Sequence, residues 1–197
     1  MIPIFIASTK SSSGKTFIAL GLAIKLIGQG YKVGYIKPIG KTPVKKGTDV
    51  FDADAIFIKE ALSLPDELDV ISPFVLSYET QNLIFQGKVK DIRKQIMTAF
   101  KSLKNKDFVL VGGGADLFDG AILNINTLSL LEDMKAHALV VESWTGDVSA
   151  DSLYGAAHIL GERFMGGVIN KVPVNSLNHV KDTVRPFLEK KGIKIFG

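Results

Sequence analysis

The sequence contains no cysteine, one tryptophan and three histidines. Without cysteine the chain can form neither a disulfide nor a cysteine-ligated zinc site, which is typical of a cytoplasmic protein. His137, His158 and His179 fall on separate predicted elements and lack the spacing of metal ligands. We therefore expect a cytoplasmic protein without a zinc site.

Long apolar stretches and large blocks of one charge are also missing. No run reaches the roughly 20 apolar residues that span a bilayer, and the N-terminus lacks the pattern of a signal peptide. The net charge is only +4 and the lysines are scattered, as on solvated helix faces rather than on a nucleic-acid-binding stripe. The sequence thus predicts a folded domain with neither a membrane nor a nucleic-acid partner.

A phosphate-binding signature is present near the N-terminus. Residues 2–8 (IPIFIAS) are typical of a buried strand, and a small-residue loop separates them from a predicted helix. The apolar residues of that helix recur with helical spacing at Phe17, Leu20, Ala23, Ile24 and Ile27. A helix that begins directly after a strand aims its free N–H groups and its dipole at one point, which makes an anion site.

The end of the loop has the residue types that phosphate binding needs. Gly14 lets the backbone approach an oxygen closely, because it has no Cβ atom. Lys15 is expected to reach the β- and γ-phosphates, and the Thr16 hydroxyl to bind Mg2+. The full pattern G-x-x-x-x-G-K-[ST] asks for glycine where this chain has Thr9.

Lys10 suggests a second feature of the loop. It stands where the deviant loop K-G-G-x-G-K-[ST] has a signature lysine, which in those families reaches the partner's nucleotide across a dimer interface. Nucleotide-dependent homodimerisation is one hypothesis, and a solvated loop lysine is the other. The predicted nucleotide-binding residues of the loop are Lys10, Ser11, Ser12, Ser13, Gly14, Lys15, Thr16 and Phe17.

Apolar strands alternate with amphipathic helices along the rest of the chain. Further strands are predicted at 31–38, 107–112, 138–143, 164–172 and 192–197. Further helices are predicted at 49–62, 91–103, 125–134, 149–160 and 175–190. Residues 40–48 are predicted as an irregular loop. This alternation indicates an α/β P-loop NTPase fold, a three-layer sandwich whose mostly parallel sheet has helices on both faces. Its loops gather at the carboxyl ends of the strands, and we expect one nucleotide-binding domain over 1–197.

The chain resembles dethiobiotin synthetase in five motifs that occur in the family's order. They are residues 7–16 (ASTKSSSGKT), 34–40 (GYIKPIG), 52–55 (DADA), 107–113 (DFVLVGG) and 166–173 (GGVINKVP). It is also similar to cobyrinic acid a,c-diamide synthases, and most similar to the N-terminal domain of long phosphotransacetylases. Residues 192–197 (GIKIFG) resemble a family strand that usually continues. We therefore expect either the N-terminal part of a longer protein or a naturally short version.

The resemblance implies ATP and Mg2+ as ligands and a set of site residues. Lys15 and Lys37 are implied to be catalytic. Lys15 holds the phosphates, and Lys37, which precedes Pro38, corresponds to the lysine that neutralises the transferring phosphate in dethiobiotin synthetases. Asp54 corresponds to a Mg2+ ligand, beside Thr16; a helix-start carboxylate is the alternative. Asn170 corresponds to the residue that recognises adenine. Val172 and Pro173 complete this nucleotide-binding set.

The sequence departs from the family at residues that take part in catalysis and substrate recognition. The family's Mg2+-binding glutamate after strand 108–111 is replaced by Gly112, with Asp116 four residues on as a possible substitute. Gly40 and Lys41 replace a small hydroxyl residue, and residues 72–76 (SPFVL) lack the family's histidine and small residues. These losses favour nucleotide binding without dethiobiotin chemistry.

Three functions are compatible with this pattern. The first is a nucleotide-sensing or assembly domain associated with phosphotransacetylase. The second is an active ATP-dependent ligase, either a dethiobiotin synthase or an enzyme similar to cobyrinic acid a,c-diamide synthase. The third is a dimerising ATPase switch of the MinD/ParA type, which Lys10 suggests and the lack of an Asp-x-x-Gly-like switch after 108–111 disfavours.

Overall fold

The computed structural model describes residues 1–89 and 91–197. The strands are β1 Ile2–Ala7, β2 Val33–Ile36, β3 Pro43–Lys46, β4 Asp49–Asp52, β5 Phe108–Gly112, β6 His137–Ser143 and β7 Phe164–Asn170. The α-helices are α1 Lys15–Gly28, α2 Ala53–Ala61, α3 Leu68–Ile71, α4 Tyr78–Phe85, α5 Ile92–Ser102, α6 Thr127–Met134, α7 Val148–Leu160, α8 Leu177–His179 and α9 Arg185–Lys190. No helix in these ranges is long and apolar enough to cross a membrane.

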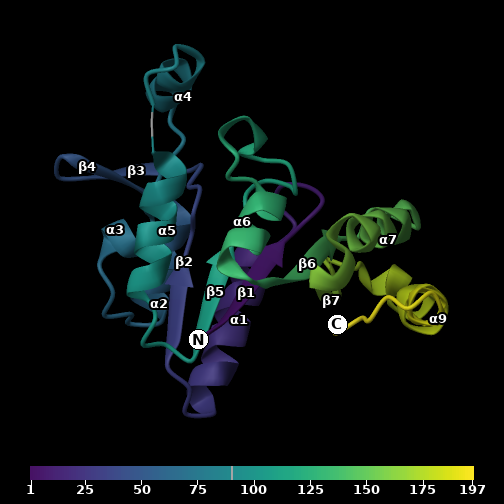
Figure 1. Cartoon of the computed structure of the whole chain (residues 1–197). Helices are drawn as coiled ribbons and strands as arrows, with labels where there is room; N and C mark the ends of the chain where they lie inside the picture. Colours follow the sequence, from purple (N-terminus) through teal and green to yellow (C-terminus); the bar gives the residue numbers. More distant parts are fainter. Residues whose placement is uncertain (90) are drawn as a thin grey trace.

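The described residues form a five-stranded sheet in the order β2-β5-β1-β6-β7, in which every pair is parallel (Figure 1). The central strand β1 lies between β5 and β6. Because both faces of the sheet are covered, its strands read as continuous apolar runs. The predicted P-loop fold with a mostly parallel sheet is confirmed.

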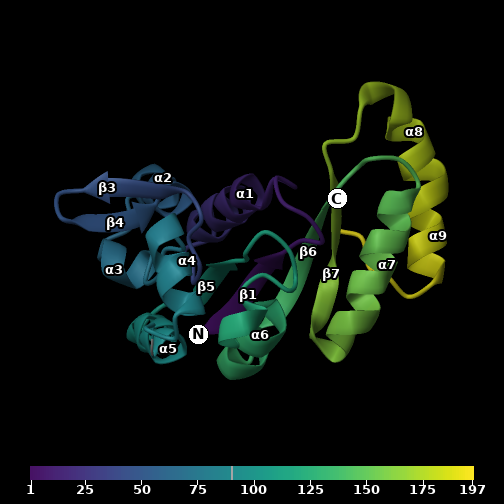
Figure 2. The same cartoon turned by 90° about the horizontal axis from the view of Figure 1, so that it is seen from above.

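Two apolar cores lie on the two faces of this sheet. In β1, Phe5 and Ala7 point into the core shared with α5, α6 and α7, whereas Ile4 and Ile6 point into the core shared with α1 and α2. This alternation follows from the two-residue period of a strand. Figure 2 shows the resulting layers, with α1 on one side of the strands and α5 and α6 on the other. The carboxyl end of β1 is thereby held at the centre of the molecule.

Helix α1 forms where the sequence predicts a helix, but only part of its apolar repeat is buried. Ala19, Ala23 and Leu26 are buried, whereas Phe17 and Ile24 are 72% and 56% exposed. The small residues Ala19 and Ala23 let the helix lie close to β1 and β5, so larger side chains are directed outward. Helical periodicity thus predicts the helix correctly but does not identify which of its apolar residues are buried.

Residues 43–52 form an antiparallel hairpin of β3 and β4, which corrects the prediction of an irregular loop at 40–48. The helix predicted at 49–62 is also wrong at its start, because residues 49–52 are strand β4 and α2 begins at Ala53. The strand partners are Pro43 with Asp52 and Lys46 with Asp49, and Gly47 adopts a φ of 65° in the turn. Proline and lysine are poor indicators of a strand, so the sequence pattern hides this hairpin.

The C-terminal region follows the prediction with one local change. The helix predicted at 175–190 is present, but a π-helical stretch at Val180–Val184 interrupts it immediately before Pro186. A proline cannot donate to the preceding turn and clashes with its carbonyl groups, and the widened π turn accommodates both effects. The last predicted strand begins to pair with β7, since Gly167 N donates to Lys194 O at 2.8 Å.

Candidate nucleotide-binding site

The loop between β1 and α1 borders a pocket of about 610 Å3 at the carboxyl ends of the strands. The lining residues are Ser11, Ser12, Ser13, Gly14, Lys15, Thr16, Phe17, Ala19, Tyr35, Lys37, Ile39, Lys41, Thr42, Asp54, Phe57, Gly112, Gly113, Gly114, Ala115 and Lys171. They come from positions far apart in the sequence, as expected for loops that follow parallel strands. Most predicted site residues are thus brought together, whereas Lys10, Asp116, Asn170, Val172 and Pro173 lie outside the lining.

The loop backbone has the strained form of an anion cradle. Ser12 and Gly14 both have positive φ angles, 56° and 96°. Gly14 is the N-cap of α1, and within the described residues no side chain caps this helix end. Its first N–H groups are therefore available to a negatively charged ligand.

The loop is braced from the end of β7. Asn170 Nδ2 donates to Ser13 O at 2.8 Å, and Lys171 Nζ donates to Ser12 O at 2.6 Å. A Cβ atom on Gly14 would lie 2.2 Å from Asn170 Nδ2, so only glycine fits there. These contacts fix two loop carbonyl groups. Asn170 has this bracing role in the structure, and its recognition of adenine stays a prediction.

Glu142 at the end of β6 holds the first half of the loop. Its side chain is fully buried and accepts a hydrogen bond from Thr9 Oγ1. Its Oε1 atom lies 2.7 Å from Lys10 Nζ, but outside hydrogen-bond geometry, so the contact is an ion pair. Lys10 Nζ also donates to Thr145 Oγ1 at 3.1 Å. The sequence places the turn that begins at Glu142 at the ligand-binding edge of the sheet, but it predicted no role for Glu142, although a carboxylate in the apolar run of β6 is a usable signal.

Lys15 folds back across the loop and is electrostatically strained. Its Nζ donates to Ser8 Oγ at 2.6 Å. Burial, and secondly the positive charge of Lys37, lower the pKa of Lys15 to about 8. Phosphate groups would relieve both effects, because they return negative charge to a desolvated ammonium group. The site is thus prepared for an anion.

Lys37 and Asp54 face each other in the pocket. Lys37 Nζ donates to Asp54 Oδ2 and lies 3.4 Å from Asp52 Oδ1. The proposed Mg2+ ligand Asp54 is therefore paired with the proposed catalytic lysine. Asp52 is fully buried and accepts from the backbone N–H groups of Asp54, Ala55, Lys41 and Thr42. Its role in this structure is to shape the loops around the pocket.

The turn after β5 has no carboxylate at its first position, Gly112. Asp116 Oδ1 accepts from the N–H groups of Phe118 and Asp119 at 2.8 and 2.9 Å, so this oxygen serves the turn itself. Asp119, which the sequence analysis missed, accepts from Ala115 N at 2.8 Å and from Lys41 Nζ at 2.7 Å. The Lys41–Asp119 pair joins two loops that flank the pocket.

The charges of the lining fit a phosphorylated ligand better than a protein-bound metal. Four lysines line the pocket, Lys15, Lys37, Lys41 and Lys171, against the single carboxylate of Asp54. Within the described residues no group of three or more His, Cys, Asp or Glu side chains could hold a metal ion. Thr16 and Asp54 could supply two oxygen ligands to Mg2+, which normally keeps several waters and binds together with phosphates. The donor set therefore fits Mg2+ only as a companion of the nucleotide.

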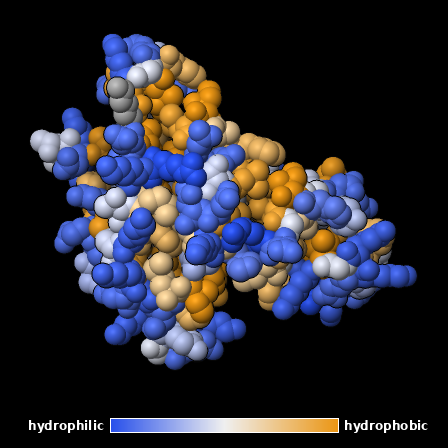
Figure 3. Space-filling model, in the orientation of Figure 1, coloured by the Kyte–Doolittle hydropathy of each residue, from blue (hydrophilic) through white to orange (hydrophobic). Residues whose placement is uncertain are grey.

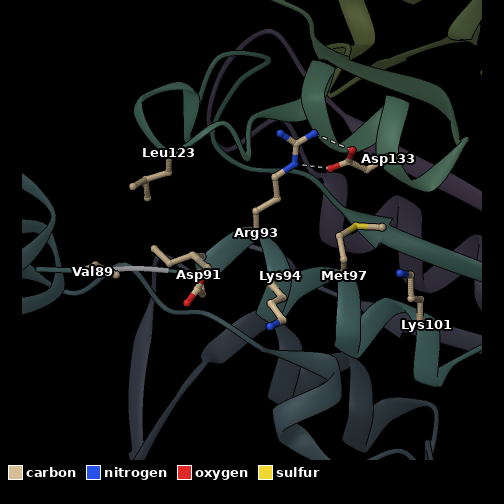
Figure 4. A pocket seen from close by; sticks show the side chains of 9 residues that line it. Val89, Asp91, Arg93, Lys94, Met97, Lys101, Leu123 and Asp133 are labelled. Atoms are coloured by element: carbon tan, nitrogen blue, oxygen red, sulfur yellow. Dashed lines mark hydrogen bonds and ion pairs between the residues drawn. The ribbon is translucent and has the colours of Figure 1, made fainter. Parts of the chain in front are cut away.

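A second hollow, of about 710 Å3, lies on the α5 side of the molecule. Figure 3 shows hydrophobic residues gathered on this face among hydrophilic ones. In Figure 4, Arg93 is directed to Asp133, and both of their hydrogen bonds are 2.6 Å long. The guanidinium group of Arg93 is thus engaged by Asp133, and the lining of this hollow contains no part of the phosphate loop.

Fold and site together define the chain as a P-loop nucleotide-binding domain. A family model named AAA_26 and described as an AAA domain matches residues 3–197. The chain belongs to this family, and within it to the domains that are similar to dethiobiotin synthetase.

Curated relatives support this placement. The ATP-dependent dethiobiotin synthetase BioD of Methanocaldococcus jannaschii is 32% identical over 117 residues, which cover 56% of this chain and 51% of that protein. The protein of the same name from Brachyspira hyodysenteriae is 23% identical over 206 residues, with 98% of this chain and 90% of that protein covered. The match thus spans about half the length of the first relative and nearly all of the second.

Solved structures show the same fold at low sequence identity. The signal recognition particle 54 kDa protein of Aeropyrum pernix K1, in complex with GDP, has a TM-score of 0.56 and 15% identity. That match covers 98% of this chain and 40% of the other. The signal recognition particle receptor FtsY of Elizabethkingia anophelis has a TM-score of 0.50 and 15% identity, with coverage of 85% and 49%. These likenesses concern the fold alone.

Proposed function

We propose that residues 1–197 form one ATP-binding domain that holds a triphosphate and signals its presence, and that turns it over slowly at most. The observation behind this proposal is the asymmetry of the pocket. Gly14, Lys15, Thr16 and Lys37 retain a phosphate cradle, whereas Gly112 offers no carboxylate at the end of β5. Loss of one preorganised electrostatic group typically lowers the catalytic rate by a factor of about 10²–10³. Binding is thus retained where catalysis is weakened.

The signalling role needs a partner, and the sequence motifs favour phosphotransacetylase domains. We propose that the chain acts in the cytoplasm as a nucleotide-sensing or assembly domain for such an enzyme, as a homodimer and with Mg2+ as companion of ATP. The support is the resemblance to the N-terminal domain of long phosphotransacetylases, together with the exposed apolar side chains of α1.

Calorimetry with ATP and ADP, each with and without Mg2+, tests the proposal. We expect saturable ATP binding at submillimolar concentration, and phosphate release that stays slow when diaminopelargonate and bicarbonate are added. An absence of heat at millimolar ATP and ADP would contradict nucleotide binding. A matched variant, Lys15→Met, should lose binding, while Lys25→Met on the outer side of α1 should retain it.

An active ligase is the second candidate. It is favoured by the names of the curated relatives and by Lys37 and Asp54, which remain together in the pocket. The decisive result is phosphate release that depends on diaminopelargonate and bicarbonate. Its absence at high enzyme concentration would reject dethiobiotin synthesis and leave the binding proposal standing.

A further inference from the structure

Tyr35 occupies the space that a side chain at position 112 would need. A Cβ atom on Gly112 would lie 2.4 Å from Tyr35 Oη and 3.1 Å from Tyr35 Cζ, far inside contact distance. Tyr35 is 2% exposed, and its ring packs in the core that α1 and α2 cover. In the sheet Tyr35 pairs with Leu110, two residues before Gly112. No residue larger than glycine fits at position 112 while this tyrosine is present.

The Tyr35 side chain lines the phosphate pocket, and among the described residues its hydroxyl has no hydrogen-bond partner. Tyr35 lines the pocket beside Lys37, whose Cδ atom lies 3.5 Å from the same Cβ position on Gly112. None of the hydrogen bonds found among the described residues uses the Tyr35 hydroxyl. The hydroxyl is therefore available at the pocket wall to donate to a ligand.

The charge state of Tyr35 suits a donor. Burial, and next the negative charges of Asp54 and Asp52, raise the pKa of the Tyr35 phenol above its ordinary value. The hydroxyl therefore remains protonated throughout the neutral pH range. Phosphate oxygens only accept hydrogen bonds, and a bond to a charged acceptor is stronger than a neutral one.

We infer that the Tyr35 hydroxyl contacts the nucleotide in place of the missing acid, by donating a hydrogen bond to the terminal phosphate of ATP on the Lys37 side of the pocket. This inference rests on the proposed function. A carboxylate at position 112 would interact with the phosphates only through a bridging Mg2+, because carboxylate and phosphate are both negatively charged. A phenol can instead donate a hydrogen bond to the phosphate directly. Tyr35 thereby makes the site specific for a triphosphate and lessens its need for Mg2+.

The first test is Tyr35→Phe, which removes one oxygen and leaves the ring in the core. We expect calorimetry to show about tenfold weaker ATP binding, the loss expected for one hydrogen bond to a charged group. ADP binding should weaken less than about threefold. The matched control Tyr31→Phe, just before the start of β2, should change neither affinity. Equal losses for ATP and ADP, or an unchanged ATP affinity, would overturn the inference.

A second pair of variants tests the exclusion of an acid. Gly112→Asp alone should lower the Tm because of the clash with Tyr35, whereas Gly112→Asp combined with Tyr35→Leu should relieve the clash and make ATP binding depend more strongly on Mg2+. If Gly112→Asp alone is tolerated and creates that dependence, Tyr35 does not exclude an acid. If the wild-type chain binds no ATP, the proposed function fails. If it binds ATP and Tyr35→Phe binds equally well, only the inference fails.

Discussion

Lys15 is the loop residue predicted to reach the phosphates, and burial together with Lys37 disfavours its charged form. Its ammonium group is desolvated, faces Lys37 and donates to Ser8. Its part in the site was predictable, because a strand, a glycine and a helix start occur within one short stretch. Its pKa was not predictable, because the charge of Lys37 comes from another strand.

A pH dependence of ATP binding follows from the pKa of Lys15, about 8 in the free protein. Bound phosphates raise this pKa, which determines the direction in which ATP affinity changes with pH. Below pH 8 the amine is already charged and affinity is nearly constant; above pH 8 binding takes up a proton, and affinity falls by up to about tenfold per pH unit. Calorimetry at pH 9 in buffers of different ionisation enthalpy measures that proton. Zero uptake would show that Lys15 is not the group that meets the phosphates.

The contacts by which distant residues brace the loop were not predicted from the sequence, even where the residue itself, such as Asn170, was expected at the site. Thr9 and Glu142 are 133 positions apart, and Asn170 Nδ2 and Ser13 O are 157 apart. Only the strand order β5-β1-β6-β7 brings them together. Tyr35 was hidden for a related reason: its hydroxyl acts at Gly112, and a glycine by itself does not reveal what occupies the space beside it.

At the scale of elements, the β3–β4 hairpin and α2 depend on one carboxylate. Asp52 ends β4 and caps α2, with accepted bonds of 3.0 and 3.2 Å from Asp54 N and Ala55 N, and it also holds the N–H groups of Lys41 and Thr42. The sequence analysis placed Asp52 at a helix start. It did not foresee the hairpin that Asp52 joins to that helix.

Asp52→Ala should therefore destabilise the protein strongly. The loss of a helix cap and of an acceptor for buried N–H groups predicts a decrease on the order of 2–4 kcal/mol in the free energy of unfolding. Urea denaturation measures it, and the exposed Asp49→Ala in the same hairpin serves as the control, with a change below about 0.5 kcal/mol. Equal effects of the two substitutions would show that Asp52 does not organise these loops.

At the scale of the whole molecule, the contacts of Lys10 bear on the proposed homodimer. Lys10 is engaged within its own chain, by the ion pair with Glu142 and the bond to Thr145. To reach a partner's nucleotide it must leave both. The exposed Phe17 and Ile24 on α1 are apolar surface that such an association could cover.

Sedimentation velocity with and without ATP measures this association. If Lys10 crosses between copies, ATP should promote a dimer and Lys10→Ala should shift it back toward monomer, by about tenfold or more in the dissociation constant. Lys25→Ala, an exposed lysine of α1, should leave association unchanged. Identical association of the wild-type and Lys10→Ala proteins would exclude the proposed role of Lys10 in dimerisation.

The sequence by itself determined the alternation of strands and helices, the parallel sheet, and the phosphate loop with Gly14, Lys15 and Thr16. These features follow from residues adjacent in the chain, whose spacing specifies local conformation. Only the tertiary structure decided which face of α1 is buried, which side chains brace the loop, and what stands at Gly112. Those properties depend on neighbours from distant strands and on the space between them. The phosphate loop was readable in the sequence, and Tyr35 in the place of an acid was not.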